Sequence, residues 1–196
     1  MTNPKDAENF VNYLCGGVDG ERNYTTIHPR TKKVLSFHGS LSSLEVQLAA
    51  ANDNGAGVFT TVNPLLGAKR LATEVVSVHG LFLDLDGAAL DPVLKVMPAP
   101  HIIVETSPGK FHVHWKVYDC HLDQFKTCQV ELASRFDGDP AVCDLPRLTR
   151  VPGYKHQKLD KMTGKLSEPF LSHIIAQHHG PAYSLTKLLK PMGSSP

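Results

Sequence analysis

Two aspartates, Asp84 and Asp86, follow an apolar run that begins near residue 78. The β-branched and aromatic residues of this run predict a buried strand, and side chains two positions apart on a strand point to the same face. Two carboxylates held side by side repel each other unless a cation lies between them. Their hard oxygens suit Mg²⁺ or Mn²⁺, so the pair predicts a metal site that handles phosphate. The simpler alternative is that both residues only end the strand, because Asp-Gly is common in turns.

A third carboxylate, Asp144, is expected at the end of a short apolar strand over 141–143. Three carboxylates together would hold two divalent cations, which clamp the attacking and leaving oxygens of a phosphoryl or nucleotidyl transfer. Arg147 and Arg150 follow in a segment stiffened by two prolines. Guanidinium groups bind phosphate through two parallel hydrogen bonds, so both arginines are predicted phosphate contacts. The alternative for this basic stretch is a solvated loop.

A strand expected at 111–117 separates polar from apolar side chains, because alternate residues of a strand point to opposite faces. The polar face carries Lys110, His112 and His114. Lys110 or His112 is suited to bind a triphosphate through charge-assisted hydrogen bonds. The alternative is that this face simply meets water. Further candidates for contacts with nucleotide or nucleic acid are Arg70, His114, Lys155 and His156, although a loop surface is the alternative for Arg70.

The composition describes a soluble, globular chain of 196 residues, 41% hydrophobic and 20% charged, which suits one domain or two lobes with a shared core. The 20 basic and 19 acidic residues nearly cancel, so any nucleic-acid contact must come from a local patch. The four cysteines form no C-x-x-C pair, which argues against a zinc ribbon. No signal peptide or membrane span is recognisable, and a cytoplasmic protein is expected.

Hydrophobic periodicity and turn residues predict an α+β architecture around a mixed or mostly antiparallel sheet. The expected helices cover 6–14, 42–52, 91–97, 122–136 and 185–189, and the expected strands cover 34–38, 57–63, 75–83, 101–106, 111–117, 141–143 and 170–175. The fourth and fifth of these strands form a hairpin, because Ser-Pro-Gly-Lys between them has the composition of a type II turn. Ser42 and Glu45 predict a capping box at the start of the second helix.

Five stretches of the chain resemble RepB-like primase domains, members of the archaeo-eukaryotic primase (primase-polymerase) superfamily of plasmids, phages and other mobile elements. They are F-H-G-S-L at 37–41, G-A-G-V-F-T-T-V-N at 55–63, L-F-L-D-L-D-G at 81–87, E-T-S-P-G-K-F-H-V-H-W at 105–115 and G-D-P-A-V-C-D-L-P-R-L-T-R-V-P-G at 138–153. The resemblance implies an RRM-like catalytic unit beside a smaller αβ unit, with the active site in the cleft between them. The expected organisation is one catalytic domain over 1–190, made of an N-terminal αβ part (1–75) and an RRM-like part (76–180), followed by a disordered tail (191–196).

The resemblance also implies template-directed nucleotidyl transfer by a DNA primase or primase-polymerase that uses two Mg²⁺ or Mn²⁺ ions. On this view Asp84, Asp86 and Asp144 are the metal ligands, His112 contacts the phosphates of the incoming nucleotide with Ser107 and Lys110 nearby, and Arg147 and Arg150 contact nucleotide or template. The expected partners are a single-stranded DNA template, its primer and nucleoside triphosphates, with a helicase or a helical primase module beyond this chain, and no membrane.

Two other functions remain open from the sequence. Asp84-Leu85-Asp86-Gly87 also resembles the first motif of haloacid-dehalogenase-type phosphohydrolases, but Ala88 stands where that family has Thr, and the following motif is too close for a helical crossover. A non-catalytic RRM-like nucleic-acid-binding module is the second alternative. It would need stacking aromatics on an exposed sheet face, whereas Phe111 and Trp115 are expected to point inward.

Overall fold

The computed structural model describes residues 2–16 and 19–189, so the tail predicted at 191–196 lies outside the described residues. The helices are α1 (Pro4–Cys15), α2 (Leu41–Asp53), α3 (Asp91–Leu94), α4 (Phe125–Arg135) and α5 (Leu185–Leu188), with a 3₁₀ turn, η1 (Ala72–Glu74). The strands are β1 (Arg22–Ile27), β2 (Val34–Gly39), β3 (Gly57–Thr61), β4 (Gly80–Leu85), β5 (Ile102–Ser107), β6 (Lys110–Lys116), β7 (Leu148–Arg150), β8 (Lys155–His156), β9 (Phe170–Leu171) and β10 (His173–Gln177). None of the helices in these two ranges is long and apolar enough to cross a bilayer.

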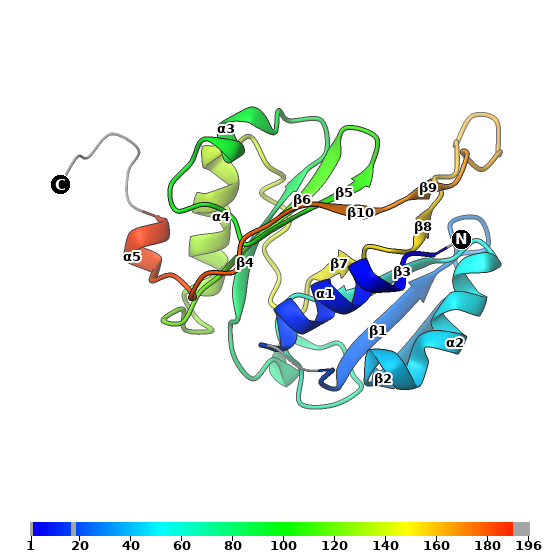
Figure 1. Cartoon of the computed structure of the whole chain (residues 1–196), viewed down its shortest axis with the longest axis horizontal. Helices are drawn as coiled ribbons and strands as arrows, with labels where there is room; N and C mark the ends of the chain where they lie inside the picture. Colours follow the sequence, from blue (N-terminus) through cyan, green and yellow to red (C-terminus); the bar gives the residue numbers. More distant parts are fainter. Residues whose placement is uncertain (1, 17–18, 190–196) are drawn as a thin grey trace.

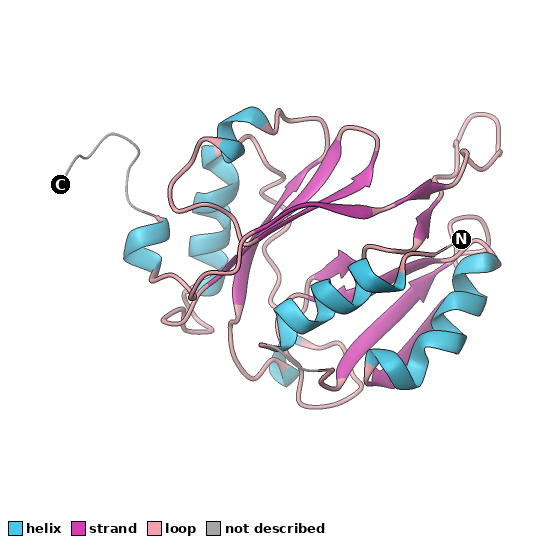
Figure 2. Cartoon of the chain, viewed as in Figure 1, coloured by secondary structure: helices cyan, strands magenta, loops and turns pink. Residues whose placement is uncertain are grey.

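The strands form two four-stranded sheets, which gives the domain two lobes (Figure 1). The first sheet has the order β2-β1-β3-β7 and the second has the order β10-β5-β6-β4, and every strand pairing within them is antiparallel. A small ribbon of β8 and β9 stands beside them. α2 packs on the first sheet and α4 on the second (Figure 2). The predicted α+β class is therefore confirmed.

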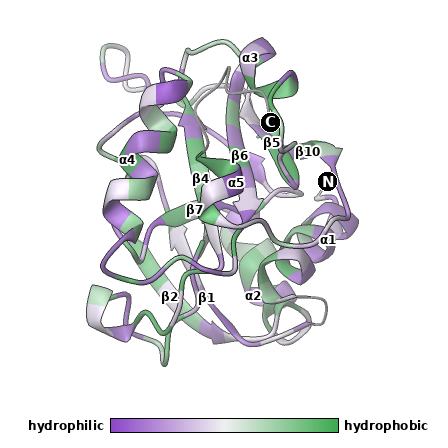
Figure 3. Ribbon diagram, turned by 90° about the vertical axis from the view of Figure 1, so that its left-hand side faces the viewer, coloured by the Kyte–Doolittle hydropathy of each residue, from purple (hydrophilic) through white to green (hydrophobic). Residues whose placement is uncertain are grey.

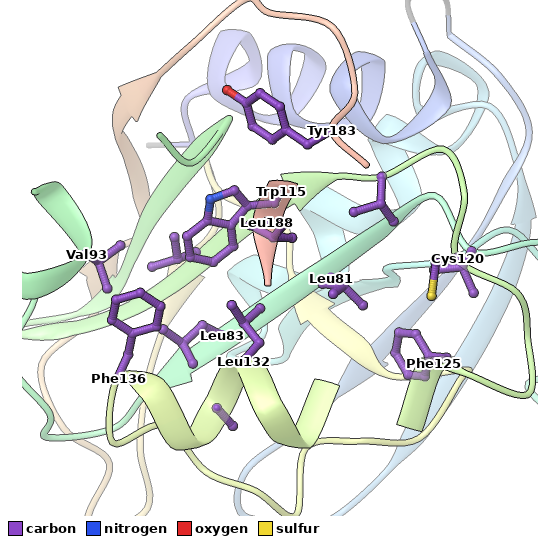
Figure 4. Packing of buried hydrophobic residues seen from close by; sticks show 14 of the residues in the cluster. Leu81, Leu83, Val93, Trp115, Cys120, Phe125, Leu132, Phe136, Tyr183 and Leu188 are labelled. Atoms are coloured by element: carbon purple, nitrogen blue, oxygen red, sulfur yellow. The ribbon is translucent and has the colours of Figure 1, made fainter. Parts of the chain in front are cut away.

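The largest core lies between the second sheet and α4 (Figure 4). Leu81, Leu83 and Leu85 of β4 point to this side, together with Val113 and Trp115 of β6. α4 mixes hydrophilic and hydrophobic residues along its length, and its buried residues include Phe125 and Leu132 (Figure 3). Because strand side chains alternate, the intervening residues of β4 and β6 must point to the opposite face of the sheet.

That opposite face is covered by α1 and by the first lobe. Phe10 and Leu14 of α1 pack against Ile102 and Val104 of β5. On its other side α1 places Ala7 and Val11 in the core of the first sheet. The helix thus belongs to two hydrophobic clusters at once and holds the two sheets together (Figure 1).

The segment 141–144 is not the strand predicted from the sequence. It runs as a turn and irregular backbone, and the pairing begins only at β7, which joins β3 of the first sheet in the register Thr60↔Thr149. Prolines on both sides of the apolar triplet interrupt it, and proline cannot donate to a sheet ladder. A strand from the C-terminal half of the chain therefore completes the N-terminal sheet.

Other element boundaries also differ from the prediction; α3, for example, ends at Leu94 and not at residue 97. α2 is capped by Ser40, whose hydroxyl accepts the Ser43 N–H at 3.2 Å, so the capping box at Ser42 is wrong. β4 starts at Gly80, because the preceding segment leaves the sheet and holds only an isolated bridge between Leu65 and Val75. The strand predicted at 170–175 is divided into two strands, β9 and β10, which pair with β8 and β5 respectively. The predicted hairpin of β5 and β6 is confirmed.

Gly153 marks the closest approach between the loop after β7 and the start of the chain. Its φ is +85°, and a methyl group added there would lie 2.2 Å from the carbonyl oxygen of Asn3. Gly153→Ala should therefore lower the free energy of unfolding by roughly 3 kcal/mol or more, since left-handed backbone costs a side chain about 1–2 kcal/mol and the clash adds to it. Urea denaturation measures this loss.

Gly109→Ala is the matched control, because Gly109 has a φ of +70° but open space around it. Gly109→Ala should lower the free energy of unfolding by only about 1–2 kcal/mol. Equal losses for the two variants would contradict the proposed clash with Asn3.

Candidate active site

The second sheet brings two carboxylates and two basic side chains together on the face turned away from α4. Asp84 on β4 is directly opposite His112 on β6, and the Nε2 atom of His112 lies 3.8 Å from Oδ1 of Asp84. Asp86, just beyond the strand, forms an ion pair with the ammonium group of Lys110. The His112 side chain is only 13% exposed, whereas that of Asp86 is 59% exposed. The site therefore runs from a buried floor to an open rim.

The electrostatics of Asp84 reflect acidic and basic neighbours from several segments. Burial raises the pKa of Asp84, and the Asp139 carboxylate raises it further, whereas Arg147, Lys110 and Lys158 lower it. Asp139 lies in the loop after α4, where its backbone N–H donates to the Asp84 carbonyl at 3.3 Å. A carboxylate whose charge is destabilised in this way is a ready partner for a cation.

Asp144, the predicted third ligand, has a different partner. Its Oδ1 atom lies 2.6 Å from Nε of Arg147, and its side chain is 46% exposed. Across residues 2–16 and 19–189, no three His, Cys, Asp or Glu side chains are grouped in a way that could hold a metal ion. The predicted cluster of Asp84, Asp86 and Asp144 is thus not assembled as a ready metal site in this structure.

The donor set nevertheless fits hard divalent cations. Asp84 and Asp86 offer oxygen ligands on one face. Asp139 and Asp144 follow in a single loop, and of these two Asp139 is the one that raises the pKa of Asp84. Mg²⁺ and Mn²⁺ prefer such carboxylate oxygens. Asp139 was not singled out as a metal ligand from the sequence, because it is one of several acidic residues in a loop and no periodicity marks it.

A basic pocket opens beside these carboxylates. It has a volume of about 280 Å³, and its lining includes Phe59, Arg150, His156 and Lys158. The Arg150 guanidinium lies 4.5 Å over the ring of Phe59, and no Asp or Glu of the described chain forms an ion pair with it. Burial lowers the pKa of Arg150 to about 10, which still leaves it charged at neutral pH. The Asp84 carboxylate raises the pKa of Arg150 but forms no ion pair with it, so the buried guanidinium is available to bind an anion.

Ser107 and Lys158 add to this group. Ser107 is 8% exposed, and its hydroxyl has no hydrogen-bond partner, although it lies beside Lys110 in the register of β5 and β6. Burial lowers the pKa of the Lys158 ammonium, and the nearby Lys110 lowers it further. Two ammonium groups this close are stabilised by an anion between them.

The remaining predicted contacts fall into three groups. Arg70 donates to the carbonyl of Pro146 at 3.4 Å, and Lys155 forms an ion pair with Asp53 at 3.1 Å, so both have partners within the fold. His156 lines the basic pocket and donates through Nδ1 to the Thr106 carbonyl at 2.8 Å. The predicted contact of His114 with nucleotide or nucleic acid is wrong, because this residue is 1% exposed and cannot touch a ligand.

His114 is buried because the first lobe and α1 cover its face of the sheet. Its ring stacks on Phe82 with the centroids 5.6 Å apart, and Phe10 meets it edge-on at 5.2 Å. The alternation of polar and apolar residues along β6 placed His112 and His114 on one face, but alternation alone does not reveal that a second sheet covers that face.

The fold is shared with solved primase domains. The AEP domain of the cyanophage S-2L primase-polymerase has a TM-score of 0.68 at 19% identity, over 95% of this chain and 96% of that one. The primase RepB′ has a TM-score of 0.65 at 18% identity, over 90% of this chain and 58% of that one. The catalytic domain of RepB′ in complex with initiator DNA has a TM-score of 0.63 at 19% identity, over 90% and 86%.

The family follows from the sequence itself. The model of the RepB DNA-primase N-terminal domain matches residues 28–178, and the chain belongs to this family. This confirms the resemblance to RepB-like primases, and with it a primase-family domain of the transferase class. A comparison with curated protein sequences finds no match.

The burial of His114 makes the stability of the fold depend on pH. Burial lowers the pKa of His114 to about 3, whereas a histidine in an unfolded chain titrates near 6.5. The unfolded state therefore takes up a proton first as the pH falls, and the free energy of unfolding decreases. Between pH 7 and pH 5 this group alone accounts for a loss of up to about 2 kcal/mol.

His114→Gln should remove that part of the pH dependence, which urea denaturation at the two pH values measures. His38→Gln is the control, because His38 lies exposed on β2. An unchanged pH dependence in His114→Gln would show that the buried ring does not stay neutral.

Proposed function

We propose that this domain joins nucleotides on a DNA template, as a DNA primase or primase-polymerase of a mobile element. The observation that carries the proposal is the convergence of Asp84 and Asp86 with Lys110, His112 and Arg150 at the junction of the two sheets. A nucleoside triphosphate with bound divalent cations complements this mixture, since its phosphates match the basic groups and its cations match the carboxylates.

The metal ligands in this proposal are Asp84 and Asp86, with Asp144 or Asp139 as the third carboxylate. Two divalent ions bound there would lower the pKa of the primer 3′-hydroxyl and stabilise the departing pyrophosphate. Release of Asp86 from Lys110 would free both groups, the carboxylate for a cation and the ammonium for a phosphate.

The side chains around the carboxylates have separate tasks in the reaction. The hydroxyl oxygen forms a bond to the α-phosphorus as the bond to pyrophosphate breaks. His112 and Ser107 donate hydrogen bonds to phosphate oxygens, and Arg150 and Lys158 neutralise the charge that develops on the leaving group. Because Ser107, His112 and Arg150 lie on strands of the two sheets, little reorganisation of these residues is needed when the nucleotide binds.

Asp84→Asn and Asp86→Asn should each reduce nucleotide incorporation at least about 100-fold, because the amide keeps the shape but loses the charge that binds a cation. Primer extension with labelled nucleotides and Mn²⁺ measures incorporation, and circular dichroism checks the fold. Asp91→Asn at the exposed start of α3 is the matched control and should keep full activity.

Full incorporation by either variant would contradict the metal assignment. Phosphate-release and DNA-binding assays on the same variants separate the alternative functions. Phosphate release from a simple phosphomonoester without incorporation would favour the phosphohydrolase. DNA binding by the wild type and by Asp84→Asn, with no incorporation by either, would favour the binding module.

The nucleic acid is proposed to follow a basic edge formed by two loops, residues 28–33 and 155–168. These 20 residues hold seven of the chain's 20 basic residues and only two of its 19 acidic ones. Arg30 donates to the Gly164 carbonyl at 3.4 Å, so the two loops touch. Lys32 and Lys158 also line the pocket beside the carboxylates, which makes the edge continuous with the site. A template strand therefore has a local patch of positive charge despite the neutral chain.

Lys161→Glu together with Lys165→Glu should weaken the binding of single-stranded DNA about tenfold or more at low salt and make the slope of log K against log[salt] less steep by roughly 1.4, about 0.7 for each lost phosphate contact. Fluorescence anisotropy at several salt concentrations measures both quantities. Lys95→Glu with Lys126→Glu makes the same change of charge next to α3 and on α4 and should have a much smaller effect. Equal losses in the two double variants would contradict the basic edge.

A further inference from the structure

A buried hydroxyl connects the two histidines of β6. Thr149 on β7 is completely buried, and its Oγ1 atom lies 3.0 Å from Nδ1 of His112 and 3.3 Å from Nε2 of His114. The backbone N–H of Arg150 also donates to Nδ1 of His112, at 3.4 Å. β7 belongs to the first sheet and β6 to the second, so these hydrogen bonds cross between the sheets.

We propose that Thr149 is a positioning residue that keeps the proton of His112 on Nε2, facing the phosphates of the nucleotide, and that His114 orients Thr149 from behind. The catalytic consequence rests on the function proposed above, but the position of the proton does not. His112 is the group that would touch the ligand, and Thr149 and His114 would act through it.

The surroundings of His112 favour one neutral form, and the Thr149 hydroxyl makes the shortest contact with Nδ1. An N–H group donates to Nδ1, so that nitrogen must offer a lone pair, and in a neutral imidazole the proton then sits on Nε2. On the other side of the ring, Nε2 faces Oδ1 of Asp84, which is an acceptor. A ring that accepts a hydrogen bond at Nδ1 carries one proton and is neutral.

The single hydroxyl proton of Thr149 fixes the direction of the chain of hydrogen bonds. Because Nδ1 of His112 is an acceptor, the hydroxyl must donate to it and accept from Nε2 of His114. The proton of His114 is then on Nε2, which leaves its Nδ1 as an acceptor. This Nδ1 atom is buried and has no hydrogen-bond partner among the described residues.

The opposite direction is unfavourable at every step. If Thr149 donated to His114, its oxygen would meet the lone pair of His112 Nδ1, and His114 would carry a buried N–H without a partner. An orphaned buried donor is rarer than an orphaned acceptor. If instead Nδ1 of His112 carried the proton, it would face the Arg150 N–H, and Nε2 would face a carboxylate without a proton to share.

This arrangement gives the first lobe a role in binding the nucleotide. A β-branched side chain has few rotamers, and Thr149 is held in register with Thr60 of β3. The hydroxyl therefore stays where the His112 ring needs it only while the two sheets keep their distance. His114 closes the far end and is itself fixed by Phe10 and Phe82.

Nitrogen-15 NMR of histidine-labelled protein, without nucleotide or metal, tests the proton position directly. His112 should show the Nε2–H tautomer in the wild type, with its signals assigned by their loss in His112→Gln. Thr149→Val keeps the shape but removes the shorter of the two hydrogen bonds to Nδ1, leaving only the 3.4 Å bond from the Arg150 N–H, and should shift part of the His112 population to the Nδ1–H tautomer. Thr149→Ser should keep the wild-type form. A wild-type His112 protonated on Nδ1 overturns the proposal, as does a Thr149→Val spectrum identical to that of the wild type.

Steady-state incorporation gives the second readout. Thr149→Val should raise the KM for the nucleotide about tenfold with a change in kcat of less than about twofold, and Thr149→Ser should restore the KM. If Thr149→Val does not fold, His114→Phe takes its place, because it keeps the ring packing and removes the donor to Thr149. Failure of the wild type to incorporate nucleotides would count against the proposed function only, since the tautomer is read from the protein alone.

Discussion

The register between β4 and β6 decides which side chains reach the site. Leu81, Leu83 and Leu85 enter the core under α4 together with Val113 and Trp115, so their neighbours must point the other way. A shift by one residue would place the carboxylates in the hydrophobic core and the leucines in the site. The cost of that exchange is many times the energy of any single contact within the site. The apolar face of the sheet therefore positions Asp84 and His112 more firmly than their own interactions do.

Between the sheets, charge balance is incomplete in a way that favours a ligand. Among the described residues no carboxylate forms an ion pair with the buried Arg150, Lys158 lies close to Lys110, and the Asp84 carboxylate is destabilised by burial and by Asp139. Each of these arrangements costs free energy in the absence of a ligand. A phosphate chain with its metal ions would relieve all of them, because it carries both signs of charge. The binding free energy of the nucleotide would thus include the release of unfavourable interactions within the protein.

The sequence predicted the parts of the fold that depend on short-range patterns. The β5–β6 hairpin follows from its turn residues, and the division of β6 into a polar and an apolar face follows from strict alternation. The strand expected at 141–143 is wrong, because three apolar residues between prolines do not specify a strand. The partners of Asp139 and Thr149 could not be read from the sequence at all. The Asp139 contact depends on how α4 packs against β4, and the Thr149 contacts depend on β7 joining the first sheet. Both are set by long-range packing.

α1 has a consequence for where the folding unit begins. The family match starts at residue 28, which leaves out α1 and the whole of β1. Without the helix, Ile102 and Val104 of the second sheet would lose their contact with Phe10. Val58 of the first sheet would lose the cluster to which Val11 contributes. A fragment limited to the matched residues would expose the hydrophobic surfaces of both sheets that α1 covers, which favours aggregation over a folded monomer. The residues that identify the family thus leave out a helix that both hydrophobic clusters need.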